Sequence, residues 1–208
     1  MKISFSTLAC PDFSWTDIYS MAKALGFGGI EVRGLGEDVF AVNARPFTDQ
    51  QLPKTVEKLR SLGLEIPCLA SGCALKYKED FDKNISEVVQ YIVLAKKLGT
   101  PYIRILGDRY PQPEGEVDDG FVAEALKLLG TIAQGFGVCL LVETIGVYSD
   151  TKRLKALLQQ VNLPSVAALW DMHHPYRYAG ESPRETVANL GGLIKYVHVK
   201  DSVMVDGK

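Results

Sequence analysis

The chain has 208 residues, a formal net charge of −2 and a pI near 5.9. Hydrophobic residues make up 47% of it and charged residues 23%, which is ordinary for a globular protein, and we expect one domain over residues 1–208. This charge gives no electrostatic indication of binding to nucleic acid or to an anionic membrane. All apolar runs are shorter than the about 18 residues that a membrane-spanning helix needs.

The first predicted element is a strand near residues 2–8. This run is too short and too polar for the core of a secretion signal, so we interpret the protein as cytoplasmic. Ser14 is expected to cap the first helix. Thr48 to Gln51 matches a capping box for the second helix. The buried face of the first helix is expected to contain Ile18, Met21, Ala22 and Leu25.

Further amphipathic helices are predicted over 81–98, 121–136, 151–160 and 183–190. Glycines at positions 26, 63, 99 and 137 follow four of the helices and lead directly into apolar strands. Their spacing is about the length of one strand–loop–helix unit. The apolar runs predict seven strands, near 2–8, 28–33, 64–70, 102–107, 138–143, 166–171 and 194–200.

Strict alternation of strands and helices predicts an α/β fold with a parallel sheet. The segment after the first strand, residues 10–13, contains no glycine and so lacks a dinucleotide-binding fingerprint. A (β/α)8 TIM barrel is therefore favoured over a nucleotide-binding doubly wound sheet. Because such a barrel usually takes about 250 residues, we expect an incomplete barrel. Its eighth strand would be missing, and residues 204–208 would lie in a loop.

The four cysteines lack the close paired spacing of zinc-binding or redox motifs. Three of them lie in or beside predicted strands. We expect buried, reduced thiols with a structural role. These residues are Cys10, Cys68, Cys73 and Cys139.

Three of the apolar strands end on a potential metal ligand: Glu143, Asp171 and His198. Such groups are costly to bury unless they are paired. Side-chain alternation places all three on the inward face of a barrel, at the mouth where active sites lie. We therefore predict one convergent divalent-metal site. The alternative is that each residue caps a helix or pairs with a local lysine or arginine.

Two carboxylates and an imidazole suit Mn²⁺, Co²⁺, Zn²⁺ or Mg²⁺ and do not choose between them. The strand ends carry no thiolate, which argues against a structural zinc site.

Three segments around these ligands resemble the xylose isomerase-like TIM-barrel superfamily of sugar-phosphate isomerases and epimerases. They are residues 142–144 (Val-Glu-Thr), 170–174 (Trp-Asp-Met-His-His) and 198–201 (His-Val-Lys-Asp). Residues 5–11 and 26–33 look like the first two strands of that superfamily, and the similarity covers the whole chain in order. The His-x-Lys-Asp and Asp-x-x-His elements are its most specific parts.

The resemblance implies a divalent metal held by Glu143, Asp171 and His198 and by a glutamate of the eighth strand. It implies that His174 touches the substrate, with His173 as a packing residue. The alternative for His174 is a helix-start histidine bonded to the backbone. The implied activity is isomerisation or epimerisation of a sugar or sugar phosphate, by proton transfer through a metal-stabilised enediolate. Glu143 would serve as ligand and as acid/base.

Three further residues are candidates for contact with a carbohydrate substrate. Lys200 shares the inward face of His198 and would hold a substrate oxygen or neutralise the carboxylates. Glu31 and Arg33 share one face of the second strand and would bind hydroxyl groups. The favoured alternative for this pair is a structural ion pair.

The same superfamily contains other activities that the candidate ligands would suit to different degrees. A metal-dependent lyase resembling inosose dehydratase needs the same ligands and the same proton abstraction. A DNA-repair nuclease resembling endonuclease IV needs several histidines for three zinc ions, and this chain has three in all; we therefore expect no specific DNA binding. A non-catalytic barrel fragment is the third alternative, and association into a homo-oligomer stays open.

Overall fold

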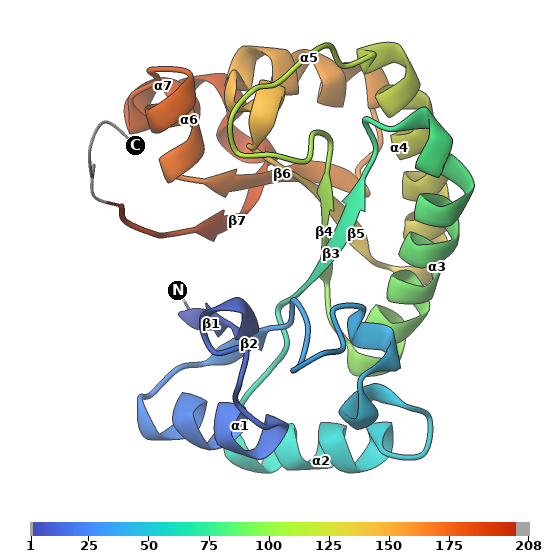
Figure 1. Cartoon of the computed structure of the whole chain (residues 1–208), viewed down its shortest axis with the longest axis vertical. Coiled ribbons are helices and arrows are strands. Elements are labelled where there is room, and N and C mark those ends of the chain that lie inside the picture. Colours follow the sequence, from blue (N-terminus) through green and yellow to red (C-terminus); the bar gives the residue numbers. More distant parts are fainter. Residues whose placement is uncertain (1, 203–208) are drawn as a thin grey trace.

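The computed structural model describes residues 2–202. In these residues strands and helices alternate along the chain, as the sequence predicts (Figure 1). The strands are β1 (Ser4–Ser6), β2 (Gly29–Glu31), β3 (Cys68–Ala74), β4 (Tyr102–Leu106), β5 (Cys139–Glu143), β6 (Val166–Asp171) and β7 (Ile194–His198). The α-helices are α1 (Trp15–Ala24), α2 (Leu52–Leu62), α3 (Phe81–Leu98), α4 (Asp119–Phe136), α5 (Thr151–Val161), α6 (His173–Tyr178) and α7 (Pro183–Leu190).

All strand pairs are parallel. β3 to β7 form a five-stranded sheet in sequence order, and β1 pairs with β2 in a second sheet. The isolated bridges Gly29–Glu65 and Val32–Leu69 join the two sheets. Among residues 2–202 no pairing connects β7 to β1, so the described strands form an incomplete barrel (Figure 1). The predicted loop at 204–208 lies outside the described residues.

The third strand differs from its prediction. It begins at Cys68 rather than near residue 64, because Pro67 has no N–H to donate to the sheet. Only the isolated bridge at Glu65 precedes it. The strand then runs on to Ala74, with a register shift against β4 between Ala70 and Ala74. The apolar run did not predict this irregular second half.

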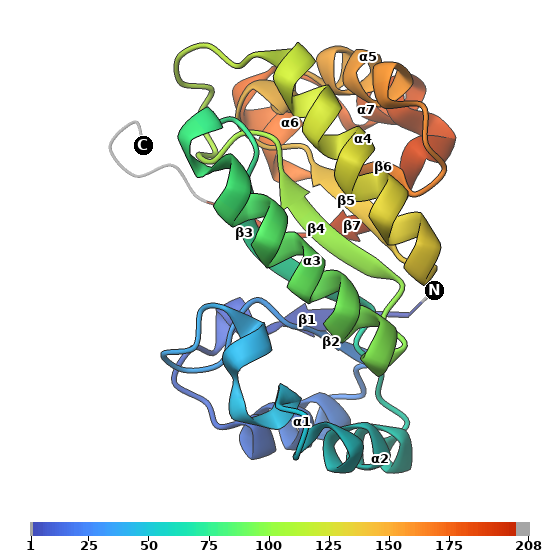
Figure 2. The same ribbon diagram turned by 90° about the vertical axis from the view of Figure 1, so that its right-hand side faces the viewer.

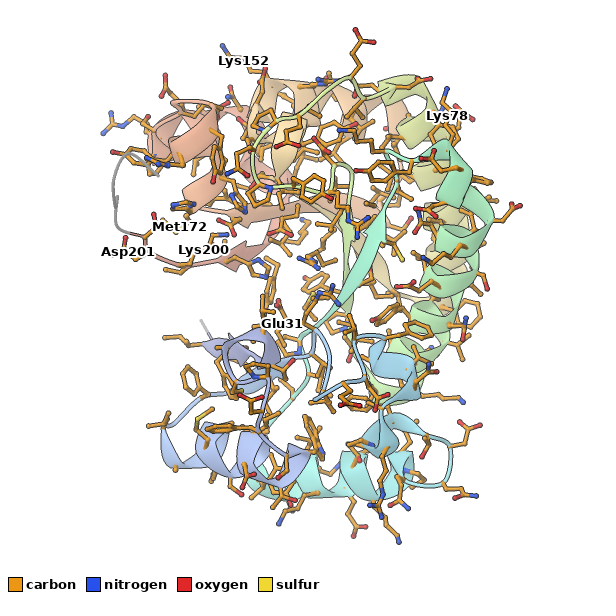
Figure 3. The ribbon with its side chains drawn as sticks, viewed as in Figure 1. Glu31, Lys78, Lys152, Met172, Lys200 and Asp201 are labelled. Carbon is orange, nitrogen blue, oxygen red and sulfur yellow. The ribbon has the colours of Figure 1, made fainter. Side chains whose placement is uncertain are left out.

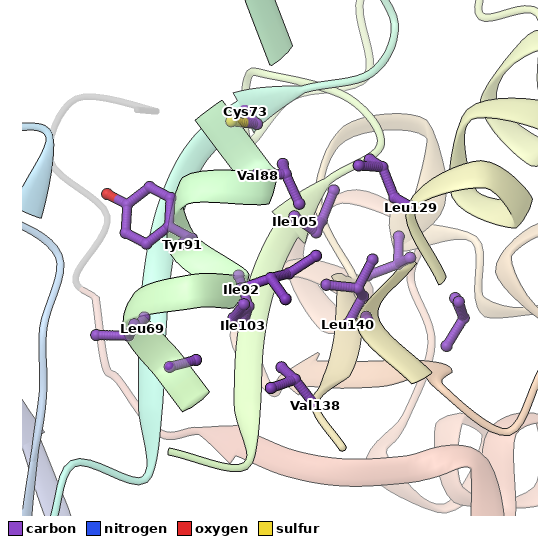
Figure 4. Close-up of a cluster of buried hydrophobic side chains, with 14 of the residues drawn as sticks. Leu69, Cys73, Val88, Tyr91, Ile92, Ile103, Ile105, Leu129, Val138 and Leu140 are labelled. Carbon is purple, nitrogen blue, oxygen red and sulfur yellow. The ribbon is translucent and has the colours of Figure 1, made fainter. Parts of the chain in front are cut away.

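The alternation of side chains along the strands is confirmed. Outward residues pack under α3 and α4, which run across one face of the sheet (Figure 2). This core includes Ile92, Ile103, Leu129 and Leu140 (Figure 4). Inward residues form a separate small cluster made of Leu141, Ala167 and Leu169, against which Tyr102, Cys139 and Tyr196 pack.

The predicted start of the first helix is confirmed by a capping box between Ser14 and Asp17. Ile18 and Ala22 are buried, but Leu25 is 66% exposed because it lies beyond the last turn of α1. The capping box predicted at 48–51 is wrong. The second helix, α2, begins at Leu52, with Pro53 in its first turn, where proline fits best.

The short helix α6 was not among the predicted amphipathic helices, because its six residues show no helical period, and only the alternative for His174 placed a helix start there. Gly63, Gly99 and Gly137 end their helices with φ between 68° and 73°, as expected, and Gly26 follows α1 with φ 77°. No helix of the described residues is long and apolar enough to cross a membrane.

All four cysteines are free; three are buried and Cys139 is half-buried. Burial raises the pKa of each thiol, that of Cys139 to about 11. Because the thiolate is the reactive form, we expect the native protein to react with DTNB at pH 8 on the order of 100-fold more slowly than the unfolded protein. When guanidinium chloride unfolds the protein, all four thiols should become reactive toward DTNB together. Fast labelling of the native protein would contradict this.

Candidate metal centre

The structure brings together the three predicted metal ligands. Glu143, Asp171 and His198 are the last residues of β5, β6 and β7, and Asp171 is in register with His198. Each offers a ligand atom within 4.8 Å of the others, and both carboxylates are buried. They lie at the carboxyl ends of parallel strands, where barrel active sites are built.

Thr144 fixes the two carboxylate-bearing strand ends relative to each other. Its Oγ1 accepts a hydrogen bond from the Asp171 amide (2.9 Å) and donates one to the Asp171 carbonyl (3.1 Å). Thr144 directly follows Glu143 and is fully buried. The backbone of Asp171 is therefore held against the end of β5.

His198 lies between carboxylates on both sides of its ring. Nδ1 is 3.4 Å from Glu143 Oε1 and 4.0 Å from Asp171 Oδ2, while Nε2 is 2.8 Å from Glu31 Oε2. Burial alone would lower the pKa of His198, but its hydrogen bonds to Glu143 and Glu31 raise it to about 10. The ring nitrogen that faces the two candidate ligand carboxylates is thus Nδ1.

Glu143 is paired with an arginine that sequence reasoning missed. Arg104 of β4 donates from Nη1 to Glu143 Oε2 at 2.9 Å. Burial alone would raise the pKa of Glu143, but Arg104 and then His198 lower it to about 2. A signal for Arg104 was present: it is the one charged residue in the apolar run Tyr102–Leu106.

Asp171 has its own cationic partner. Lys200 Nζ lies 2.7 Å from Asp171 Oδ2 and donates to His174 Nε2 at 2.9 Å. Asp171 Oδ1 accepts from the backbone amide of His173, at the start of α6. The predicted position of Lys200 at the site therefore agrees with the structure. Lys200 and Glu31 lie on either side of the open part of the barrel (Figure 3).

His174 is buried beside this pair. It lies in the first turn of α6, as the helix-start alternative predicts, but its Nε2 faces Lys200 and Asp171 rather than the backbone. Burial lowers the pKa of His174, which favours the neutral ring. Both histidine rings pack against Tyr178, and His173 also contacts Ser202 through Nε2.

The expected ion pair between Glu31 and Arg33 is wrong for the described residues. Glu31 bonds to His198 instead, and Arg33 donates to the Val39 carbonyl at 3.3 Å. The two residues share a strand face by sequence, but Glu31 turns to the cation across the barrel. Burial and the nearby Arg104 lower the pKa of Arg33.

The residues present fit a divalent ion. Two buried carboxylates and an imidazole nitrogen converge, a set that suits Mn²⁺, Co²⁺, Mg²⁺ or Zn²⁺. The carboxylates are paired with the cationic groups of Arg104, Lys200 and His198. Such pairing offsets the cost of burying charge.

A family model described as "Xylose isomerase-like TIM barrel" matches residues 20–208. Comparison with curated proteins finds no match. Among solved structures, the probable 3-DHS dehydratase involved in petrobactin synthesis from Bacillus anthracis is similar, with a TM-score of 0.80 at 21% identity. The match covers 95% of this chain and 72% of that one.

Two further structures have a TM-score of 0.75. One is a xylose isomerase-like TIM barrel protein from Mycobacterium smegmatis in complex with magnesium, at 19% identity over 96% of this chain and 74% of that one. The other is 3-keto-D-glucoside 4-epimerase from E. coli, at 16% identity over 97% of this chain and 79% of that one. These likenesses show the fold.

Proposed function

Because the chain belongs to the xylose isomerase-like TIM-barrel family, we propose that it is a divalent-metal-dependent isomerase or epimerase of a small sugar or sugar phosphate. The convergence of Glu143, Asp171 and His198 at the carboxyl ends of three adjacent strands carries this proposal. The epimerase and the magnesium-bound protein among the similar structures support it.

In this proposal Glu143, Asp171 and His198 hold the ion, and Glu143 is also the acid/base. A bound divalent ion would polarise the substrate carbonyl and so acidify the neighbouring C–H group. Arg104 keeps the Glu143 carboxylate ionised, which is the form that binds a metal ion.

The remaining candidate residues would bind substrate in this proposal. Lys200 is 44% exposed, so its ammonium can reach a substrate oxygen while it also pairs with Asp171. His174 orients that ammonium through Nε2 and lines the site as a neutral ring. Arg33 would bind a hydroxyl or acidic group of the substrate from the β2 side.

A metal-dependent lyase is the second candidate. One of the similar structures is a probable dehydratase. A lyase would use the same ligands and the same proton abstraction, and would differ in expelling a hydroxyl group next to the carbanion. The ligand set does not separate the two reactions.

The test is incubation of the Mn²⁺-loaded protein in D₂O with a panel of ketoses and inositol ketones, followed by NMR. We expect an epimer or isomer that carries deuterium at the carbon next to the carbonyl, and loss of turnover after chelation with EDTA. Addition of Mn²⁺ or Co²⁺ should restore turnover. A dehydrated product would favour the lyase, and full activity after exhaustive chelation would rule out the metal-dependent mechanism.

A further inference from the structure

The guanidinium of Arg104 connects three strands at the metal centre. Nη1 donates to Glu143 Oε2 on β5 at 2.9 Å, and Nη2 donates to the Ser71 carbonyl on β3 at 2.6 Å. β4, which carries Arg104, lies between these two strands. The arginine side chain is only 12% exposed, so its contacts form away from bulk water.

The contact between Arg104 and Ser71 depends on the irregular second half of β3. The register between β3 and β4 shifts between Ala70 and Ala74, so Ser71 is not in a regular pair with β4. The Ser71 carbonyl is then available to accept from Arg104. The Ser71 hydroxyl in turn donates to the Arg104 carbonyl at 2.7 Å. These two bonds fix the arginine at both its backbone and its side chain.

The two oxygens of Glu143 consequently have different partners. Oε2 accepts from Arg104, while Oε1 lies 3.4 Å from His198 Nδ1, on the side of the other candidate ligands. We propose that Arg104 is a positioning residue that holds Oε2 of Glu143, so that this carboxylate offers only Oε1 to a divalent ion. The inference rests on the proposed metal site.

If Arg104 and Glu143 formed an ion pair with a structural role alone, the loss of Arg104 would have a different effect. Its loss would lower stability without changing how the carboxylate meets an ion. If Arg104 positions Glu143, its loss frees Oε2 to turn toward the ion, and the carboxylate can then bind through both oxygens. The coordination number of the ion therefore separates the two roles.

The test is titration of the full chain with Co²⁺, followed by visible absorption, for the wild type, Arg104→Gln and Arg153→Gln. Arg153 is a matched control because its Nε lies 2.9 Å from Asp119 Oδ2, between α5 and α4, and its loss also removes an arginine–carboxylate pair. We expect Arg104→Gln to shift the Co²⁺ bands and lower their intensity, as an added ligand does. Arg153→Gln should leave the spectrum unchanged.

Arg104→Lys covers the case in which Arg104→Gln does not fold. A lysine keeps the positive charge, but one ammonium cannot reproduce the fork that reaches both Ser71 and Glu143, so a smaller shift of the same sign is expected. Spectra of folded Arg104 variants that match the wild type would overturn the proposal for Arg104 alone. A wild-type protein that binds no Co²⁺ at this centre would overturn the metal site itself.

Discussion

Replacing Asp171 with asparagine is expected to lower the affinity for Mn²⁺ by more than about 100-fold, beyond the loss typical of residues that only support a ligand. The amide removes one of the two buried carboxylates that converge with His198. It also leaves Lys200, 2.7 Å away, without its anion, so that a positive charge would face the incoming cation. Calorimetric titration of the purified protein with Mn²⁺ measures the effect.

Asp108→Asn is the matched control for this substitution. Asp108 is another buried carboxylate with a lysine partner, Lys76 at 3.2 Å, but it follows β4 and is not among the converging ligands. The Asp108→Asn substitution should lower the stability of the protein and leave its Mn²⁺ affinity near that of the wild type. Equal affinities for Asp171→Asn and the wild type would show that Asp171 is not a ligand.

Glu31→Ala should weaken Mn²⁺ binding by about 10–100-fold, although Glu31 is not expected to touch the ion. Its carboxylate lies 2.8 Å from Nε2 of His198, on the side of the ring away from the other ligands. An acceptor at that position fixes the proton on Nε2, so that Nδ1 is free to bind metal, and it holds the ring plane. The alanine variant loses both effects.

Glu31→Gln separates the hydrogen bond from the charge. The amide oxygen can still accept from Nε2–H, so we expect a smaller loss of Mn²⁺ affinity than for Glu31→Ala. Thermal unfolding of both variants shows whether the fold is retained. Wild-type affinity in folded Glu31→Ala would mean that His198 keeps its orientation without this partner.

The ligand positions could be predicted from the sequence because each lies at the boundary of an apolar run. The last residue before a run ends marks the edge of the sheet, and alternation along the strand gives the side to which it points. Glu143, Asp171 and His198 needed no knowledge of the loops. The same reasoning gave the inward cluster that contains Leu141 and Leu169.

The supporting residues could not be predicted in the same way. The contact of Arg104 with Ser71 depends on the shifted register of β3, and a pattern of apolar residues does not encode a bulge. By sequence Glu31 could pair with Arg33, two residues along the strand, or with a cation of another strand, and the position of β7 relative to β2 decides between them. Sequence reasoning chose the nearer one, Arg33, whereas the structure pairs it with His198.

The hydrogen bond between Glu31 and His198 joins residues that are 167 positions apart. Closing so long a loop has a large entropic cost, and contacts of this kind form only once the intervening strands are in place. The support that Glu31 gives to His198 is therefore complete only when β2 and β7 are both in place, whereas the three candidate ligands lie on the adjacent strands β5 to β7. An ion held by His198 would favour the state in which Glu31 orients the imidazole ring, and it would thereby stabilise the fold in which this hydrogen bond joins β2 to β7.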